Sequence, residues 1–197
     1  MSRLIILTGQ SSSGKDTAQD KLISDYGYRP LILYTTRPMR PNEQNGVDYV
    51  FVTEESFKNH IDTDVFVYYA TFNAYEEDGG DLHTWYYGLR KRKLKSNSVV
   101  VTDIDHIKPI KDFYESLGDE VVVVMLDVPV EEREQRARNR QGDSFCMDEW
   151  LRRVMDETVC YSADKINELV DIVVDNTRVD AIDDLMVSLS WEQYILT

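Results

Sequence analysis

LIILTGQSSSGKDT, residues Leu4–Thr17, is the segment that decides how the rest of the chain is interpreted. It is a short apolar run, then a loop rich in Gly and Ser, then a Lys that opens a helical pattern. A phosphate-binding P-loop requires this order of strand, loop and helix. Gly9 and Gly14 let the backbone approach an anion closely, and the N–H groups at the start of the helix point toward it. Lys15 can reach the phosphates as a point charge.

The last position of the motif departs from the common pattern G-x-x-x-x-G-K-[ST], because Asp16 replaces the hydroxyl residue and Thr17 follows one residue late. That hydroxyl usually binds Mg²⁺, and a carboxylate can do so directly or through water. The residues expected around the phosphates of ATP are Gly9, Ser11, Ser12, Ser13, Gly14, Lys15, Asp16 and Thr17. The alternative is a surface turn with a solvated lysine, which the flanking strand and helix patterns disfavour.

The composition is that of an acidic chain with enough apolar residues for a core. Of 197 residues, 42% are hydrophobic, and the formal net charge of −14 disfavours general binding to nucleic acid or anionic membranes. No apolar run approaches a membrane span, no signal peptide is visible, and Cys146 and Cys160 are too few for a disulfide framework. We therefore expect a cytoplasmic monomer or homodimer that binds phosphates at a local basic site.

Alternating apolar runs and helical patterns predict an α/β fold of the P-loop NTPase type. The expected buried strands are Leu4–Leu7, Val99–Val101, Val121–Leu126 and Ile172–Val174, and the expected helices are Lys15–Ser24, Ile107–Ser116 and one starting near Met147. This alternation favours three layers around a mainly parallel sheet. Ligands bind beyond the carboxyl ends of such strands, so Gly9–Lys15 and Asp103–Asp105 should open on the same crevice.

The pattern changes between residues 34 and 95. Tyr49–Val52 and Val65–Phe72 predict short strands, and Thr53 caps a predicted helix at Glu54–Ile61. We expect a small α+β insert at about 34–95 in a core of about 1–33 and 96–197, with a helical lid at about 134–158. The turn-rich section 73–83 predicts a mobile acidic loop.

Five segments in order along the chain resemble the guanylate kinase family. They are the P-loop, YTTRPMRPNEQNGVDYVFV (Tyr34–Val52), WYYG (Trp85–Gly88), DID (Asp103–Asp105) and RARNRQGDS (Arg136–Ser144). The second resembles T-T-R-x-x-R and G-x-x-Y-x-F-V, and the last resembles the lid pattern R-L-x-x-R-G-T-x-S with one residue inserted. The resemblance implies an ATP- and Mg²⁺-dependent kinase that acts on a nucleoside 5′-monophosphate, with GMP or dGMP expected first.

By this resemblance, a clamp for the phosphate of the monophosphate is formed by Arg37, Arg40, Tyr49 and Tyr87. The chemistry agrees, because arginine forks match phosphate oxygens bidentately and tyrosine hydroxyls add neutral donors. Such a clamp would place the acceptor phosphate in line with the γ-phosphate of ATP. The alternative is that the arginines solvate a loop and the tyrosines belong to the core.

Three arginines of this chain resemble the lid arginines of the family: Arg136, Arg140 and Arg153. We expect Arg140 and Arg153, together with Lys15, to stabilise charge on the transferred phosphoryl group when the lid closes. The alternative is a solvated helix whose arginines pair with nearby glutamates. We expect Asp16 and Asp103 to hold Mg²⁺, and the resemblance assigns Asp105 to the base of the substrate.

The base-reading half departs from the family. Leu33 replaces a Ser, Tyr68 stands where a Glu usually accepts from guanine, and Leu89 replaces a hydroxyl residue. A carboxylate is the natural acceptor for the paired N–H donors of guanine, and its loss costs on the order of 1.5–3 kcal/mol. Either Asp105 and the acidic loop Glu76–Asp81 replace it, or the base is not guanine.

Two other functions remain open from the sequence. A sugar-phosphate kinase resembling ribose 1,5-bisphosphate phosphokinase needs no base pocket and can also carry G-K-D, but Arg40, Gly46 and Tyr49 fit the nucleotide clamp better. A non-catalytic binding module resembling the guanylate-kinase-like domains of scaffolds typically lacks a working P-loop, whereas Gly14 and Lys15 are present here.

Overall fold

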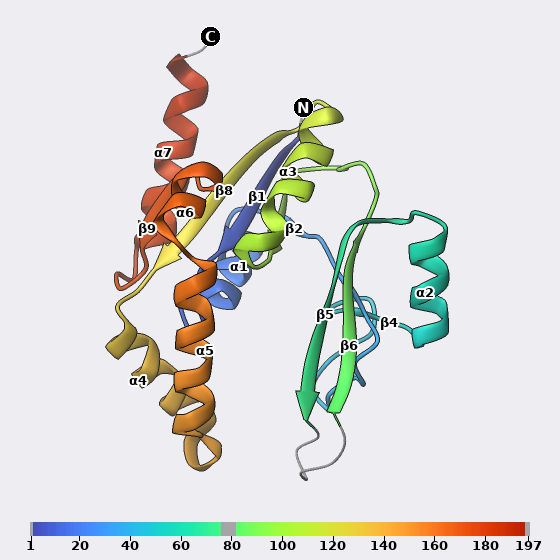
Figure 1. The fold of residues 1–197 in the computed structure, drawn as a ribbon. Coiled ribbons are helices and arrows are strands. Elements are labelled where there is room, and N and C mark those ends of the chain that lie inside the picture. The colour runs from blue at the N-terminus through green and yellow to red at the C-terminus, as the bar shows by residue number, and fades with distance from the viewer. Residues whose placement is uncertain (1, 76–81, 196–197) are drawn as a thin grey trace.

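The core of the fold is a parallel sheet (Figure 1). The computed structural model describes residues 2–75 and 82–195, and within them the sheet has the order β2-β7-β1-β8-β9 with parallel pairing throughout. Its strands are β2 (Arg29–Pro30), β7 (Ser98–Val101), β1 (Arg3–Thr8), β8 (Glu120–Asp127) and β9 (Ile172–Asp175). The four strands that the apolar runs predict are therefore confirmed.

Helices cover both faces of this sheet, because successive strand residues point to opposite sides. In β1, Ile5 and Leu7 belong to one buried cluster, and Leu4 and Ile6 belong to the other. The covering helices are α1 (Lys15–Ser24) and α7 (Ala181–Ile195) on the first face, and α3 (Ile107–Ser116) and α6 (Ala163–Leu169) on the second. The predicted three-layer α/β fold is confirmed, and the predicted helices Lys15–Ser24 and Ile107–Ser116 have the bounds of α1 and α3.

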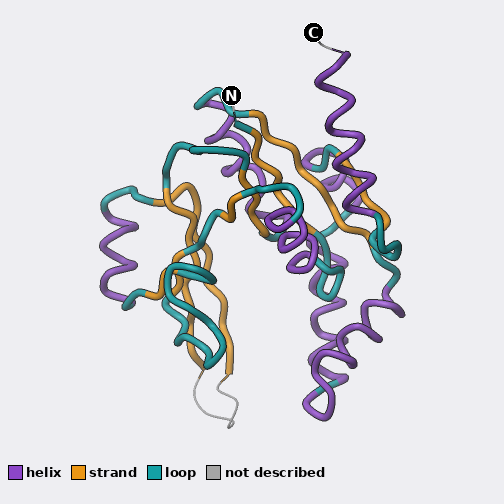
Figure 2. Tube along the Cα trace, turned by 180° about the vertical axis from the view of Figure 1, so that it is seen from behind, coloured by secondary structure: helices purple, strands orange, loops and turns teal. Residues whose placement is uncertain are grey.

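A second, smaller sheet lies beside the first (Figures 1 and 2). Its order is β4-β3-β6-β5, and its elements are β3 (Tyr34–Thr35), β4 (Val50–Phe51), α2 (Glu54–Asp62), β5 (Phe66–Tyr75) and β6 (Leu82–Arg90). Thr53 caps α2 by accepting the Ser56 N–H at 3.2 Å. The fully buried Phe57 anchors α2 by stacking on Phe66, with ring centroids 4.6 Å apart.

The hairpin of this sheet is longer than the sequence indicates. Residues 73–75 and 82–83 were predicted to lie in a loop, but they continue β5 and β6, with Asn73 opposite Thr84 and Tyr75 opposite Leu82. That part of the loop prediction is wrong, because pairing with a partner strand outweighs turn-rich local composition. The rest of the predicted acidic loop, residues 76–81, lies outside the described residues.

Two helices extend beyond the carboxyl edge of the core sheet (Figure 1). They are α4 (Val130–Gln141) and α5 (Met147–Cys160), joined through the short 3₁₀ helix η2 (Gly142–Ser144). A second 3₁₀ helix, η1 (Ile104–His106), leads from β7 into α3. Among the described helices, none has the length and apolar content needed to cross a bilayer.

Candidate active site

The loop after β1 has the backbone of a phosphate cradle. Gly9 and Gly14 have φ angles of +144° and +93°, a region that side chains rarely adopt. A Cβ at Gly9 would lie 2.6 Å from the carbonyl oxygen of Leu126, and one at Gly14 would lie 2.7 Å from Asn176 Nδ2. Both glycines are therefore required by conformation and by space.

Lys15 turns its amine back into the loop. Its Nζ donates to the carbonyl oxygens of Gly9 at 2.6 Å and Gln10 at 3.1 Å. Burial lowers the pKa of Lys15, and the carboxylates of Asp103 and Glu157 oppose that shift. The amine is thus held at the centre of the loop.

The cradle opens on a cavity of about 810 Å³. Of the predicted phosphate-binding residues, Ser11, Ser12, Gly14, Lys15, Asp16 and Thr17 line it. The three lid arginines line it as well, together with residues 176–179, which follow β9. Gly9 and Ser13 belong to the loop but are not among the described lining residues. The structure therefore brings the P-loop and the lid arginines to one cavity.

A second cavity, of about 820 Å³, lies between the small sheet and the carboxyl end of β7. Its lining includes Arg37, Arg40, Tyr49, Tyr68 and Tyr87, all from the predicted substrate site. Leu33, Thr102, Asp103 and His106 line it as well. These residues form two contact groups.

The first group contains the predicted phosphate clamp. Arg37 Nη2 lies 2.6 Å from Glu43 Oε1, and Glu43 Oε2 accepts the Arg40 N–H at 2.8 Å. The Arg37 guanidinium lies 5.6 Å from the ring centroid of Tyr49, whose ring is 5.9 Å from that of Tyr87. One carboxylate, which the sequence did not single out, therefore holds the side chain of Arg37 and the backbone of Arg40.

The second group surrounds Tyr68. Its hydroxyl lies 3.2 Å from Thr102 Oγ1, and its ring stacks on His106 with centroids 4.7 Å apart. Burial raises the pKa of Tyr68 to about 12 and lowers the pKa of His106. These groups offer neutral hydrogen bonds at pH 7.

Two residues of the base-reading hypothesis are not among the described residues that line this cavity. Asp105 Oδ1 forms an ion pair with Lys165 Nζ at 2.5 Å, and Asp105 is not among the described residues that line the cavity. Leu89 is buried in the core cluster behind β6, with 1% exposure. Leu89 lies opposite Tyr68 in the β5–β6 ladder and Asp105 directly precedes His106, but neither residue is among the described residues that line the cavity.

Two of the three lid arginines, Arg136 and Arg153, already have acceptors within the protein. Arg136 donates to the carbonyl oxygens of Asn176 at 2.8 Å and Ser13 at 3.4 Å, and it pairs with Glu132 at 2.6 Å. Arg153 Nε lies 2.7 Å from Glu149 Oε1. Arg152 and Arg153 lower the pKa of Glu149 to about 2, with Arg152 the larger cause. The glutamate pairing considered from the sequence thus occurs within the described lid.

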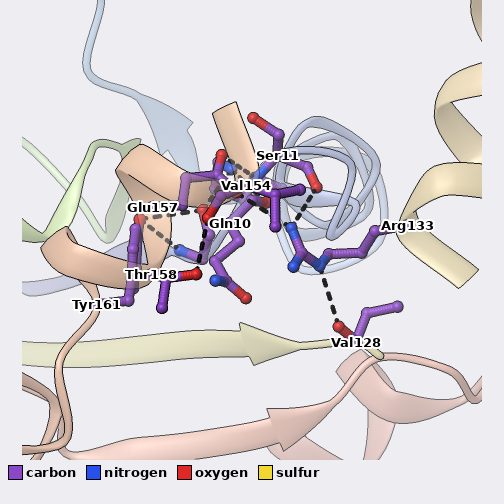
Figure 3. Close-up of polar contacts among 10 residues, drawn as sticks. Gln10, Ser11, Val128, Arg133, Val154, Glu157, Thr158 and Tyr161 are labelled. Carbon is purple, nitrogen blue, oxygen red and sulfur yellow. Dashed lines mark hydrogen bonds and ion pairs between the residues drawn. The ribbon is translucent and has the colours of Figure 1, made fainter. Parts of the chain in front are cut away.

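The P-loop is held from outside by residues that the sequence reasoning missed (Figure 3). Glu157 accepts the Ser11 N–H, the Tyr161 hydroxyl contacts Gly9, and the Asn176 side chain donates to the Ser13 carbonyl oxygen at 2.7 Å. Glu157 and Tyr161 are one helical turn apart, which places them on the same face of the chain as α5 ends. That spacing was the available signal, but only the fold shows what the face contacts.

The described residues contain no cluster of three or more His, Cys, Asp or Glu side chains that could hold a metal ion. Mg²⁺ needs no such cluster, because it commonly binds one or two carboxylates together with phosphate oxygens and water. Asp16 is exposed at the P-loop cavity, and the charge of Asp103 acts on Lys15. The donor set therefore fits Mg²⁺ arriving with ATP.

A P-loop at the carboxyl edge of a parallel sheet, facing a second cavity with an arginine–tyrosine clamp, defines a P-loop phosphotransferase. The guanylate kinase family model matches residues 1–190, and the chain belongs to that family. The predictions of the family and of an enzyme within it are confirmed.

Individual relatives agree with this assignment. The chain is 33% identical over 147 residues to the guanylate kinase of Sulfurimonas denitrificans, covering 72% of this chain and 66% of the relative. It is 34% identical over 157 residues to that of Porphyromonas gingivalis, covering 74% and 76%. The crystal structure of guanylate kinase from Anaplasma phagocytophilum superposes on this chain with a TM-score of 0.64 at 20% identity. The superposition covers 98% of this chain and 86% of that structure, and it supports the fold.

Proposed function

We propose that this chain transfers the γ-phosphoryl group of ATP to GMP or dGMP, giving ADP and GDP or dGDP. The observation that carries the proposal is the position of Asp103. It lines the clamp cavity, and its charge acts on Lys15, which lines the P-loop cavity. The acceptor and donor phosphates would therefore meet beside Lys15.

On the acceptor side, Arg37, Arg40, Tyr49 and Tyr87 would hold the phosphate. Glu43 already holds the Arg37 fork at this cavity, so the fork is oriented before substrate arrives. A phosphate monoester has a second pKa near 6 and is largely dianionic at pH 7. Its oxygen can attack without a general base, and the clamp contributes position and charge neutralisation.

On the donor side, the P-loop N–H groups and Lys15 would bind the β- and γ-phosphates. Arg140 and Arg153 line the same cavity from the lid and would stabilise charge on the transferred group, while Asp16 and Asp103 would hold Mg²⁺. Bound Mg²⁺ supplies neutralisation of the phosphate charge. We also propose that residues 1–33 and 96–197 form the core, residues 34–95 the insert that binds the acceptor, and residues 134–158 the lid.

On the base side, Tyr68, Thr102 and His106 would face guanine. Each can accept or donate one hydrogen bond without carrying a charge. Because Asp105 pairs with Lys165, we do not assign guanine recognition to that carboxylate in the described arrangement.

A coupled ADP-release assay tests the proposal with ATP, Mg²⁺ and a panel of GMP, dGMP, AMP, CMP, UMP, dTMP and ribose 1,5-bisphosphate. We expect the highest kcat/KM with GMP or dGMP. Turnover only with the sugar phosphate would replace the proposal with the sugar-phosphate kinase. ATP binding without any turnover would leave a binding module.

A further inference from the structure

A buried ion pair joins the base of the lid to the P-loop. Arg133 of α4 and Glu157 of α5 lie 3.1 Å apart between Nη1 and Oε2, with side chains 3% and 16% exposed. Figure 3 shows the pair against the backbone of the loop, with Arg133 Nε also donating to the carbonyl oxygen of Val128 at 3.2 Å. Neither residue belongs to the phosphate-binding sets described above.

The pair contacts both polar backbone groups of Ser11. The Ser11 N–H donates to Glu157 Oε1 at 2.7 Å, and the Ser11 carbonyl oxygen accepts from Arg133 Nη1 at 3.3 Å. The carboxylate meets the donor and the guanidinium meets the acceptor, so the pair fixes the orientation of this part of the loop. Four residues beyond Glu157, the Tyr161 hydroxyl contacts the N–H and carbonyl of Gly9. The end of α5 thus holds the loop at two points.

The same pair lies on the two helices that carry Arg140 and Arg153. Arg140 lies two helical turns beyond Arg133 on α4, and Arg153 lies one turn before Glu157 on α5. The charge of Glu157 also opposes the lowering of the Lys15 pKa. One contact therefore relates the loop, Lys15 and the helices that carry Arg140 and Arg153.

Stability alone does not account for this arrangement. Moving two charges out of water costs free energy that their attraction only partly returns, so a buried ion pair is weak grounds for a stabilising role. Both side chains instead point toward Ser11, and this arrangement is what holding the loop in one orientation requires.

We propose that Arg133 and Glu157 are positioning residues, which hold the P-loop in its ATP-binding shape and set the base from which Arg140 and Arg153 reach the γ-phosphate. The catalytic part of this inference rests on the proposed kinase function, whereas the effect on ATP binding does not.

Glu157→Gln is the first test, with dissociation constants for Mg·ATP measured by calorimetry without acceptor and KM values for ATP and GMP measured separately. Loss of one charge-assisted hydrogen bond should weaken ATP binding roughly tenfold. The KM for GMP should stay within about twofold, because neither Arg133 nor Glu157 is among the described residues that line the clamp cavity. The matched control is Glu134→Gln, which breaks an exposed pair with Arg138 on the same helix. We expect this control to match the wild type.

A charge exchange separates orientation from ion pairing. The double variant Arg133→Glu with Glu157→Arg keeps opposite charges, but it turns the carboxylate toward the Ser11 carbonyl and the guanidinium toward the Ser11 N–H. We expect ATP binding to stay weak even where the thermal midpoint recovers. If Glu157→Gln proves unfolded, Arg133→Lys carries the same test, since it keeps the charge and loses the fork.

Unchanged ATP affinity in a folded single variant would overturn the inference, as would equal weakening of ATP and GMP or full rescue by the exchange. If the wild type phosphorylates no monophosphate, the proposed function fails, yet the ATP dissociation constants still decide whether the pair positions the loop.

Discussion

Tyr161→Phe should destabilise the fold by an amount that the structure allows us to work out. The Tyr161 hydroxyl contacts Thr8 Oγ1 at 3.0 Å, the Gly9 N–H at 3.2 Å and the Gly9 carbonyl oxygen at 3.0 Å. Tyr161 is 9% exposed and Thr8 is fully buried, so water does not readily replace the lost hydroxyl. The substitution leaves a buried donor without its partner while changing the shape of the side chain very little.

Leaving one buried donor unpaired costs about 1–3 kcal/mol. A cost of about 2 kcal/mol changes the ratio of folded to unfolded protein about 30-fold. For a chain of this size, it lowers Tm by about 4–8 °C. Urea unfolding and calorimetry of the two proteins would measure both quantities.

Tyr114→Phe is the matched control. Tyr114 is fully buried, its hydroxyl has no hydrogen-bond partner among the described residues, and burial raises its pKa to about 12, as it does for Tyr161. Removing an unpaired buried hydroxyl should be neutral or stabilising. The reasoning is refuted if Tyr161→Phe unfolds within about 0.5 kcal/mol of the wild type, or if both substitutions cost the same.

Four further predictions concern the phosphates, the base and pH. Lys15→Ala should lower kcat on the order of 10²–10³-fold, because it removes a positive charge that stabilises the transferred phosphoryl group. A small change in single-turnover assays would contradict this role of Lys15. Asp16→Asn should raise the Mg²⁺ concentration for half-maximal rate roughly tenfold; a titration matching the wild type would exclude Asp16 from the metal site. GMP should exceed IMP in kcat/KM by less than about tenfold, because neutral hydrogen bonds surround Tyr68, and steep discrimination would point to an unassigned carboxylate. Finally, Arg152 and Arg153 hold the pKa of Glu149 at about 2, below its ordinary 4.5. Its contribution to stability is therefore complete above pH 4.5 and is lost as pH falls toward 2. Urea unfolding of the wild type and Glu149→Gln should show a difference that shrinks over that range, and a constant difference would contradict the pairing.

Local patterns explain what could be predicted. The bounds of α1 follow from Gly14, whose left-handed backbone ends the loop, and from the run after Lys15, which buries Ala18 and Leu22 one helical turn apart. The strands of the core could be found because they are covered on both faces and are therefore continuously apolar. The clamp residues could be grouped because the resemblance supplied their spacing.

The features that could not be predicted depend on contacts between residues that are far apart in the sequence. Glu157 and Ser11 are 146 positions apart, and Asp105 and Lys165 are 60 apart. Helix packing decides which partner a long polar side chain finds, and one sequence carries no record of that choice. The hairpin at residues 73–75 and 82–83 was missed for the same reason, since its strands stabilise each other across the ladder.

Several cationic groups expected to meet phosphate already hold an internal acceptor: Arg37 has Glu43, Arg153 has Glu149, and Lys15 has two carbonyl oxygens. Nucleotide binding would therefore be an exchange, in which a phosphate oxygen displaces a protein oxygen. At Arg37 and Arg153, exchange replaces one ion pair with another, so their part of the affinity should respond weakly to ionic strength. It also offers little to a polyanion that cannot enter the cavities, which would help this acidic protein choose mononucleotides in a cell crowded with RNA.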